Sequence, residues 1–203
     1  MNTKLAITDV PIHDILARRW SGRAFDRNKS VSRKQLTALL EAARWAPSCY
    51  NDQPWRYLVW DRFRNEAAWK QAFDCLGEWN RNWVKNAGPI LFLACADSVF
   101  MRNGNPNRHG QYDTGAASEN ICLQAAALGL MAHQMGGFDV AKTRKAFAIP
   151  ERYALMAMIT VGHPAPPDTL ETEYRADEFS ERTRAVLDTH FFEDGWDVPF
   201  NTR

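Results

Sequence analysis

The sequence predicts a mixed α/β chain in which helices outnumber strands. Helical and strand patterns alternate through its first half, which indicates strand–helix units. The run PILFLACAD at 89–97 is apolar almost throughout, as is typical of a strand buried on both faces. The stretch DTGAASENICLQAAALGL at 113–130 is apolar nearly all round, which indicates a central helix. The polar segment after Pro164 shows no such pattern, so we expect it to be irregular and to lie against a second subunit.

The first two helices are bounded by residues typical of helix ends. Asp9 and Pro11 mark the start of the first helix, which runs to about residue 19. Ser32 begins the second helix with a capping box, and Pro47 ends it. We therefore expect two helices before the first strand.

The remaining elements follow from the same patterns. In chain order they are a strand at 54–61, a helix at 63–76, the strand at 89–97, a loop at 102–111, the helix at 113–130, a strand at 131–135, a helix at 140–149 and a strand at 153–164. Alternating or continuous apolar character marks the strands, and a 3.6-residue apolar period marks the helices. Gly129 ends the central helix, and Asp139 caps the helix after it.

The bulk properties narrow the range of functions. The chain has 203 residues, which fits one domain over 1–203, and 25 Lys and Arg against 24 Asp and Glu. A nucleic-acid binder would carry a basic excess, so a local basic cluster in this balanced chain suggests a site for one small anion. The N-terminus lacks a signal-peptide core and no apolar stretch reaches the ~20 residues of a membrane span, so we expect a cytoplasmic protein without membrane contact. The four cysteines lack metal-site spacing, so no metal is expected.

The first motif with chemical content is RRWSGR at 18–23. Alternate residues of an extended segment point the same way, so Arg19, Ser21 and Arg23 are expected to face one spot. Two guanidinium groups and a hydroxyl suit the oxygens of a phosphate. Taken alone, these residues fit a solvated helix end equally well.

Two further motifs suit a flat ligand. The run APSCYNDQPW carries Ser48, Asn51 and Gln53, whose uncharged donors and acceptors can read the edge of a heterocycle. Turns favour the same residues regardless of ligand. In QMGGFD, the backbone of Gly136 and Gly137 can approach a flat ligand closely, although an ordinary strand-to-helix turn fits as well.

Two weaker signals complete the set. Cys49 shows no convincing His or Asp partner, so a nucleophilic role receives little weight. Arg182 and Arg184, again two residues apart, form either a solvated pair or a second basic side of the anion site.

Together, these motifs resemble the nitroreductase family of flavoproteins, from about residue 9 to 192. The element APS…N.QPW is the most specific part of the resemblance. The resemblance implies an α+β fold with a central, mostly antiparallel sheet flanked by helices. It also implies a homodimer with two FMN molecules at its interface and a central helix that packs against its mate. The C-terminal arm, about 165–203, would extend over the partner subunit.

The resemblance also assigns roles to residues. The cofactor-binding residues it implies are Arg19, Ser21, Arg23, Pro47, Ser48, Cys49, Asn51, Asn80, Gly136, Gly137, Arg182 and Arg184. The first two and last two would bind the FMN phosphate, while Arg23 would lie near the pyrimidine edge and favour the anionic reduced flavin. The residues from 47 to 51 would come from the partner subunit. Asn80 would bind the isoalloxazine rim, and the amides of Gly136 and Gly137 would face flavin N5 and O4.

The implied reaction uses no catalytic side chain. NAD(P)H would deliver a hydride to FMN N5, assisted by the backbone of Gly136, and a nitroaromatic, quinone or flavin acceptor would then take the same place in a ping-pong mechanism. The aromatic residues that could line the acceptor pocket, each of which also fits plain packing, are Trp79, Trp83, Phe100 and Tyr112. Arg102 or Arg108 either binds the 2′-phosphate of NADPH or is simply solvated.

Three residues depart from the family pattern, and three other functions stay open. Cys49 replaces a frequent serine, Trp83 stands where some relatives carry a lysine over the flavin, and Trp20 replaces a smaller or more polar residue.

The first alternative function is a specialised reaction. Relatives on the same fold use reduced FMN for dehalogenation, azoline oxidation or flavin breakdown. Flavin binding without turnover is a further alternative. The last is binding of a nucleic acid or other anion, against which the charge balance speaks.

Overall fold

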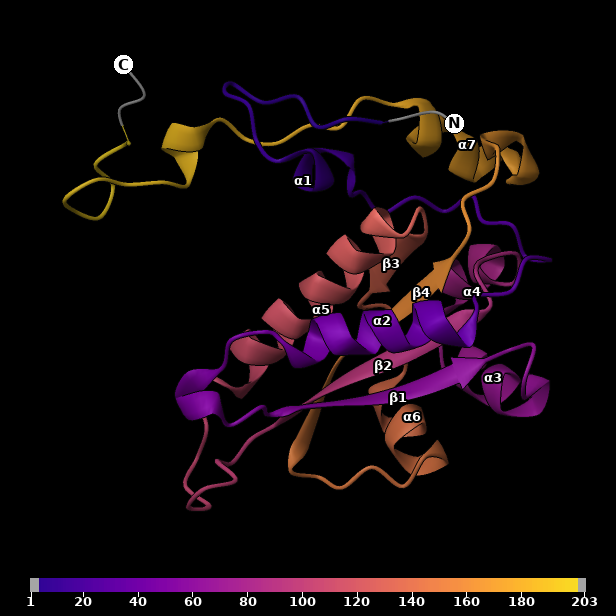
Figure 1. Ribbon diagram of the computed structural model, residues 1–203, viewed down its shortest axis with the longest axis horizontal. Helices are drawn as coiled ribbons and strands as arrows, with labels where there is room; N and C mark the ends of the chain where they lie inside the picture. Colours follow the sequence, from indigo (N-terminus) through magenta and orange to yellow (C-terminus); the bar gives the residue numbers. More distant parts are fainter. Residues whose placement is uncertain (1–3, 201–203) are drawn as a thin grey trace.

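The computed structural model describes residues 4–200 and has a four-stranded sheet between two layers of helices (Figure 1). The strands are β1 (Trp55–Asp61), β2 (Ile90–Asp97), β3 (Met131–Met135) and β4 (Tyr153–Gly162). Their order is β1-β2-β4-β3, and every neighbouring pair is antiparallel. The α+β class is therefore confirmed, and the α/β layout suggested by alternating elements is wrong. Asp61 pairs with Ile90, so the helices between β1 and β2 return the chain to the same end of the sheet and no parallel crossover forms.

The helices cover both faces of the sheet. They are α1 (Asp14–Arg18), α2 (Arg33–Arg44), α3 (Glu66–Phe73), α4 (Glu78–Val84), α5 (Gly110–Ala127), α6 (Val140–Ala146) and α7 (Thr172–Phe179), with 3-10 turns at Cys49–Asn51, Pro167–Thr169 and Leu187–Thr189. α2 and α5 pack on one face, and α3, α4 and α6 pack on the other (Figure 1). Within the described range, 4–200, no helix is both long and apolar enough to cross a membrane.

Strand β2 is the centre of both hydrophobic cores. All of its residues are buried, as the sequence predicts. Ile90 and Phe92 belong to the core beneath α2 and α5, while Leu91 and Leu93 belong to the opposite core. Successive side chains of a strand alternate between faces, so a strand covered on both sides must be apolar throughout.

Several helix boundaries differ from the sequence prediction. α1 begins at Asp14 and not near Asp9, because the ring of His13 caps its first turn. The capping box of α2 is confirmed, and so is Gly129 as the residue that ends α5, with φ 68°. α5 begins earlier than predicted, and α3 and α6 are shorter. α4 and α7 are absent from the predicted elements, because each buries only two side chains and so shows no clear apolar period.

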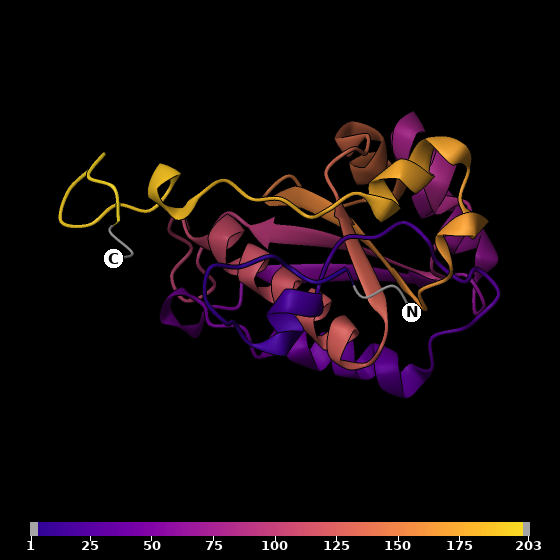
Figure 2. The same ribbon diagram turned by 90° about the horizontal axis from the view of Figure 1, so that it is seen from above.

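The N-terminal segment and the C-terminal segment that follows α7 run side by side above the sheet layer (Figures 1 and 2). Nη1 of Arg182 donates hydrogen bonds to the carbonyl oxygens of Lys4 at 3.0 Å and Ala17 at 2.6 Å. The segment after Pro164 is only partly irregular, since it contains α7 and buries Tyr174. This part of the C-terminal segment packs on its own chain.

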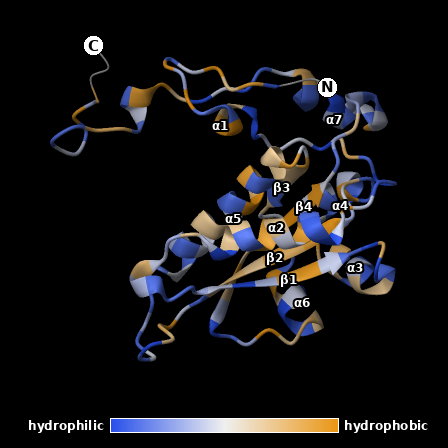
Figure 3. Cartoon of the chain, in the orientation of Figure 1, coloured by the Kyte–Doolittle hydropathy of each residue, from blue (hydrophilic) through white to orange (hydrophobic). Residues whose placement is uncertain are grey.

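The last described residues behave differently. Beyond about Leu187 the chain projects away from the body (Figure 2) and carries apolar residues (Figure 3). The segment folds back on itself through a bridge between Phe192 and Pro199. Trp196 remains 84% exposed. Exposed apolar groups of this kind mark a surface that another molecule covers.

The close approach of Gly88 to β4 gives a stability prediction. A Cβ at position 88 would lie 2.2 Å from the carbonyl oxygen of Val161, so the backbone would have to move. We expect Gly88→Ala to lower the free energy of unfolding by about 2 kcal/mol or more, measured by urea denaturation. Lys34→Ala, on the exposed side of α2, should change it by less than about 0.5 kcal/mol. A Gly88→Ala protein as stable as the wild type would contradict this packing.

Candidate functional site

Three arginines from the two ends of the chain lie together. Burial, and after it the positive charges of Arg19 and Arg184, lowers the pKa of Arg182. Nη1 of Arg182 contacts the carbonyl oxygen of Ala17, two residues before Arg19. Glu119 of α5 forms an ion pair with Arg19 at 3.2 Å. Arg182 of the C-terminal segment therefore lies near the segment that carries Arg19 within a single chain.

Arg23 contacts the C-terminal helix α7, whereas Arg19 pairs with α5. Its Nη1 pairs with Oδ2 of Asp177 at 2.8 Å, and its backbone N–H donates to Oε1 of Glu178 at 2.6 Å. Its guanidinium carbon lies 6.0 Å from the centre of the Trp83 ring. The Nε–H is buried and has no hydrogen-bond partner among residues 4–200. A buried donor without an acceptor is costly, so this group suits an acceptor supplied by a ligand.

The loop after β3 presents two glycine amides. In the turns and loops between residues 4 and 200, no backbone hydrogen bond is donated by Gly136 or Gly137. The Gly137 carbonyl oxygen accepts from the Gly77 N–H and from Nδ2 of Asn80, each at 2.9 Å. A Cβ on Gly137 would lie 2.8 Å from that Nδ2 atom, so this contact favours glycine. Both glycines are exposed, so their amides are available to a ligand.

Trp83 connects the Arg23 and glycine parts of the site. Its Nε1–H donates to Oδ1 of Asn80 at 3.2 Å, and Asn80 in turn donates to Gly137. The indole is only 1% exposed and packs on the ring of His133, with centroids 4.7 Å apart. Trp83 is therefore a core residue that orients Asn80, and not the open wall for an aromatic acceptor that the sequence suggested. The second N–H of the Asn80 amide remains for a ligand.

His133 of β3 supports the RWSGR segment. Its Nδ1 lies 3.1 Å from the Gly22 carbonyl oxygen and donates to it in the neutral ring. Gly22 is packed so closely that a Cβ there would lie 2.5 Å from the sulfur of Met131. Burial lowers the pKa of His133 to about 4, and the charges of Arg23 and Arg19 act in the same direction. His133 is thus uncharged at pH 7 and fixes the backbone between the arginines.

A cavity of about 480 Å³ adjoins Arg18 and Arg19. Its basic side includes Lys4, Arg18 and Arg19, and most of its remaining wall is apolar and comes from α5, β3 and the segment at 164–167. Of the predicted cofactor residues it contains only Arg19. We therefore take the glycine amides and the predicted arginines, and not this cavity, as the candidate site.

The loop between α2 and β1 is strained. Tyr50, Asn51 and Gln53 have φ between 50° and 56°, a left-handed conformation that costs about 1 kcal/mol or more for a residue other than glycine. The buried carboxylate of Asp113 holds the loop by accepting the Cys49 N–H at 3.0 Å. Strain of this kind clusters at functional sites. No sequence motif marks Asp113, so it is absent from the predicted site.

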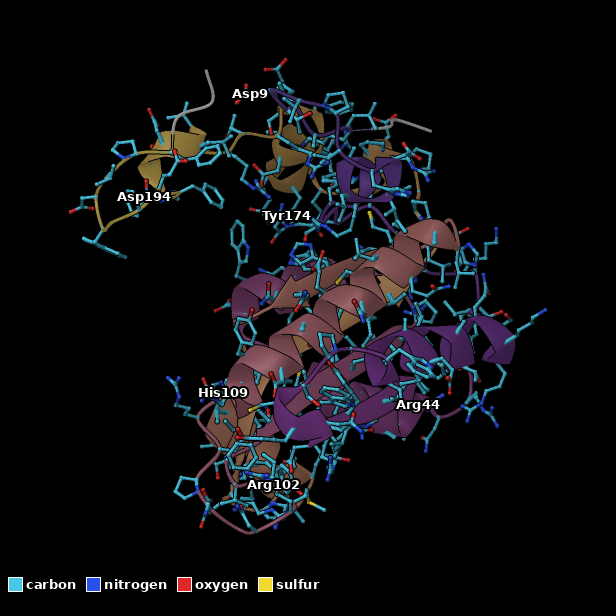
Figure 4. All side chains as sticks on the ribbon, turned by 60° about the vertical axis from the view of Figure 1, so that its left-hand side comes forward. Asp9, Arg44, Arg102, His109, Tyr174 and Asp194 are labelled. Atoms are coloured by element: carbon cyan, nitrogen blue, oxygen red, sulfur yellow. The ribbon has the colours of Figure 1, made fainter. Side chains whose placement is uncertain are left out.

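The predicted cofactor residues form two groups at opposite ends of the molecule. Asn80 lies beside Trp79, whose ring is 5.2 Å from that of Tyr174. The strained loop lies beside Arg102, whose guanidinium covers the Tyr50 ring at 3.7 Å. Figure 4 shows Tyr174 toward one end of the molecule and Arg102 toward the other. One chain cannot bring both groups to the same flat ligand.

The predicted pocket aromatics divide in the same way. Trp79 is 57% exposed at the Asn80 end, and Tyr112 is 81% exposed on the first turn of α5. Phe100 packs edge-on against Tyr50, with centroids 6.1 Å apart. These side chains form no common wall within one chain.

Comparison with known proteins identifies the family. A model of the nitroreductase family matches residues 16–163. The chain belongs to the nitroreductase family. YodC of Bacillus subtilis, whose name proposes an NAD(P)H nitroreductase, is 26% identical over 181 residues, which cover 76% of this chain and 90% of that protein. Protein DrgA of Synechocystis is 26% identical over 172 residues, or 73% and 82% of the two chains.

Solved structures agree with this membership of the nitroreductase family. A crystal structure described as an oxidoreductase containing FMN superposes with a TM-score of 0.83 at 28% identity, covering 94% of this chain and 96% of its own. A nitroreductase family protein from Clostridium difficile, 22% identical, shows the same fold, with a TM-score of 0.69 over 92% and 100% of the chains. The family, the α+β fold and the enzyme class, an oxidoreductase, are as the sequence predicts. Arg182 and Arg184 lie beyond the matched range.

The hydrogen bond from Trp83 to Asn80 gives a testable prediction. Trp83→Phe removes the N–H and keeps an aromatic ring. Because Asn80 then loses the donor that orients it, we expect the Kd for FMN, measured by fluorescence titration, to rise about fivefold to tenfold. Trp60→Phe is the control, since Trp60 is buried in the same core against Phe147 and should leave the Kd within about twofold. An unchanged Kd in Trp83→Phe would exclude the positioning role.

The neutral His133 predicts acid sensitivity. Its folded pKa of about 4 lies below the ordinary value of 6.5, so the unfolded chain takes up the proton first as the pH falls. Its contribution to stability is therefore intact above pH 6.5 and is lost as the pH falls toward 4, by about 3 kcal/mol in all. His133→Gln keeps an N–H donor without titrating in this range. Urea denaturation at pH 7 and pH 4.5 should show a smaller loss for this variant than for the wild type, and equal losses would contradict the assignment.

Proposed function

We propose that this member of the nitroreductase family is an FMN-dependent oxidoreductase that passes a hydride from NAD(P)H to nitroaromatic, quinone or flavin acceptors. The observation that carries the proposal is the free pair of amides at Gly136 and Gly137, which Asn80 and Trp83 connect to Arg23 with its unpartnered Nε–H. Unpartnered N–H donors of this kind suit the polar edge of a flat heterocycle. The strained loop supplies the second group of contacts.

The residues present fit both the phosphate and the ring system of FMN. Arg19, Arg182 and Arg184 offer three guanidinium groups to one phosphate, and the nearby Ser21 is exposed. Glu119 offsets only part of this charge. The glycine amides, Asn80 and Arg23 offer donors to the ring system.

The proposal includes a second copy of the chain, which would bring the two groups of cofactor-binding residues together. The 47–51 loop of one chain would then face the glycine amides of its partner. The projecting segment beyond Leu187, with Trp196 exposed, would lie against the partner as well. The proposed unit is therefore a homodimer with exchanged C-terminal arms.

This arrangement gives the cofactor and the protein different roles. When bound, FMN supplies the hydride transfer through its N5 atom. The glycine amides orient the ring, and Arg23 places positive charge beside its pyrimidine edge, partly offset by Asp177. Trp83 and neutral His133 exclude water behind these donors. We propose that the reductant and the acceptor use one pocket in turn, which gives ping-pong kinetics.

The phosphate contact can be tested with two flavins. Arg184→Gln removes one guanidinium whose Nη1 contacts only the Thr183 carbonyl oxygen among the described residues. We expect its Kd for FMN to rise about tenfold to a hundredfold, as for loss of a charged hydrogen bond, while its Kd for riboflavin, which lacks the phosphate, stays within about twofold. Arg64→Gln, an exposed arginine after β1, is the control. Equal losses for both flavins would remove Arg184 from the phosphate site.

Three simpler observations bear on the whole proposal. The purified protein should carry flavin absorbance, elute as a dimer, and oxidise NAD(P)H with at least one of the three acceptor classes. A protein that takes up no FMN would refute the proposal. Bound FMN without turnover of any such acceptor would favour a specialised flavin reaction.

A further inference from the structure

We propose that Arg102, held on the ring of Tyr50, forms a subsite for an oxyanion carried by a planar substrate. The anion is either a carboxylate on the aromatic acceptor or the 2′-phosphate of the reductant. This inference rests on the proposed function, because Tyr50 lies between Cys49 and Asn51, which are expected to meet the partner's FMN.

The guanidinium of Arg102 is placed by two aromatic rings. Its central carbon lies 3.7 Å from the centre of the Tyr50 ring and 5.6 Å from that of Phe100. Tyr50 is 69% exposed, so this stack lies at the surface and not in the core. A guanidinium stacked on an aromatic face keeps its N–H groups available at its edge.

The backbone around the stack is fixed as well. The carboxylate of Asp52 accepts the N–H of Met101 at 3.1 Å and that of Arg102 at 3.4 Å. These bonds join the strained 49–53 loop to the segment that carries Arg102. Tyr50 itself has φ 56°, so its ring is held by a backbone conformation that few residues adopt. The subsite is therefore organised before a ligand arrives.

The charge balance leaves Arg102 free to bind an anion. Arg152 pairs with Asp97 at 2.8 Å, and Arg56 donates to the Gln53 and Trp55 carbonyl oxygens. Asp52 is engaged by backbone amides. Arg102 has no ion pair and no side-chain hydrogen bond with any residue that the structure describes. An unpaired guanidinium fork matches a carboxylate or a phosphate in two parallel hydrogen bonds.

Matched substrate pairs test the subsite in the FMN-loaded protein. One pair is 4-nitrobenzoate and 4-nitrobenzamide, and the other is NADPH and NADH. We expect Arg102→Gln to lower kcat/KM about tenfold or more for the charged member of at least one pair, and less than about twofold for its counterpart. The same variant should raise the Kd of 4-nitrobenzoate or of 2′,5′-ADP, measured by calorimetry without turnover.

The outcomes separate the source of the anion. Loss confined to 4-nitrobenzoate assigns the subsite to the acceptor, and loss confined to NADPH and 2′,5′-ADP assigns it to the reductant. Arg64→Gln controls for the change of net charge. Tyr50→Asn, which removes the ring but tolerates the left-handed backbone, should weaken the same ligand.

Unchanged values for both pairs in Arg102→Gln, or equal losses for both members of each pair, would overturn the inference. Failure of the proposed function would show separately, as a wild-type protein without flavin absorbance. The two calorimetric titrations would then decide the subsite by themselves.

Discussion

The carbonyl oxygen of Gly137 is the contact on which the candidate site depends. It accepts one hydrogen bond from the start of α4 and one from Asn80 within that helix. These bonds join the loop after β3 to α4 and set the plane of the adjoining peptide group. Because a C=O and the N–H of the next residue share one plane, fixing the Gly137 carbonyl also fixes the Phe138 amide. The Phe138 N–H donates to the Gly136 carbonyl oxygen at 3.1 Å, and this bond in turn orients the Gly137 N–H. The buried indole of Trp83 extends this constraint into the core.

Local patterns in the sequence predict much of the fold. The capping box of α2, the buried β2 and the glycine after α5 each depend on neighbouring residues, and all are observed. The antiparallel order of the strands depends on contacts between distant residues, so it became apparent only through the resemblance to a family. α7 is missed because Tyr174 and Glu178 are its only buried positions, too few to give a period.

The residues of the candidate site also differ in whether the sequence alone reveals them. Glycines and clustered arginines are visible in the sequence because their chemistry is local. Asp113, His133 and Asp177 are isolated polar residues whose importance comes only from what they contact: the Cys49 amide, the Gly22 carbonyl and the Arg23 guanidinium. Trp83 has an aromatic side chain that suits either a pocket wall or a core, and its burial shows which of the two it joins.

The contact of Arg182 with the backbone near Arg19 has a consequence for biosynthesis. Arg19, the first of the three arginines proposed to bind the phosphate, leaves the ribosome long before Arg182 and Arg184. Glu178, which holds the backbone of Arg23, is also made late. A nascent chain thus carries Arg19 and Arg23 before the residues that complete the proposed site, so we expect tight cofactor capture only after residues 178–184 have been made.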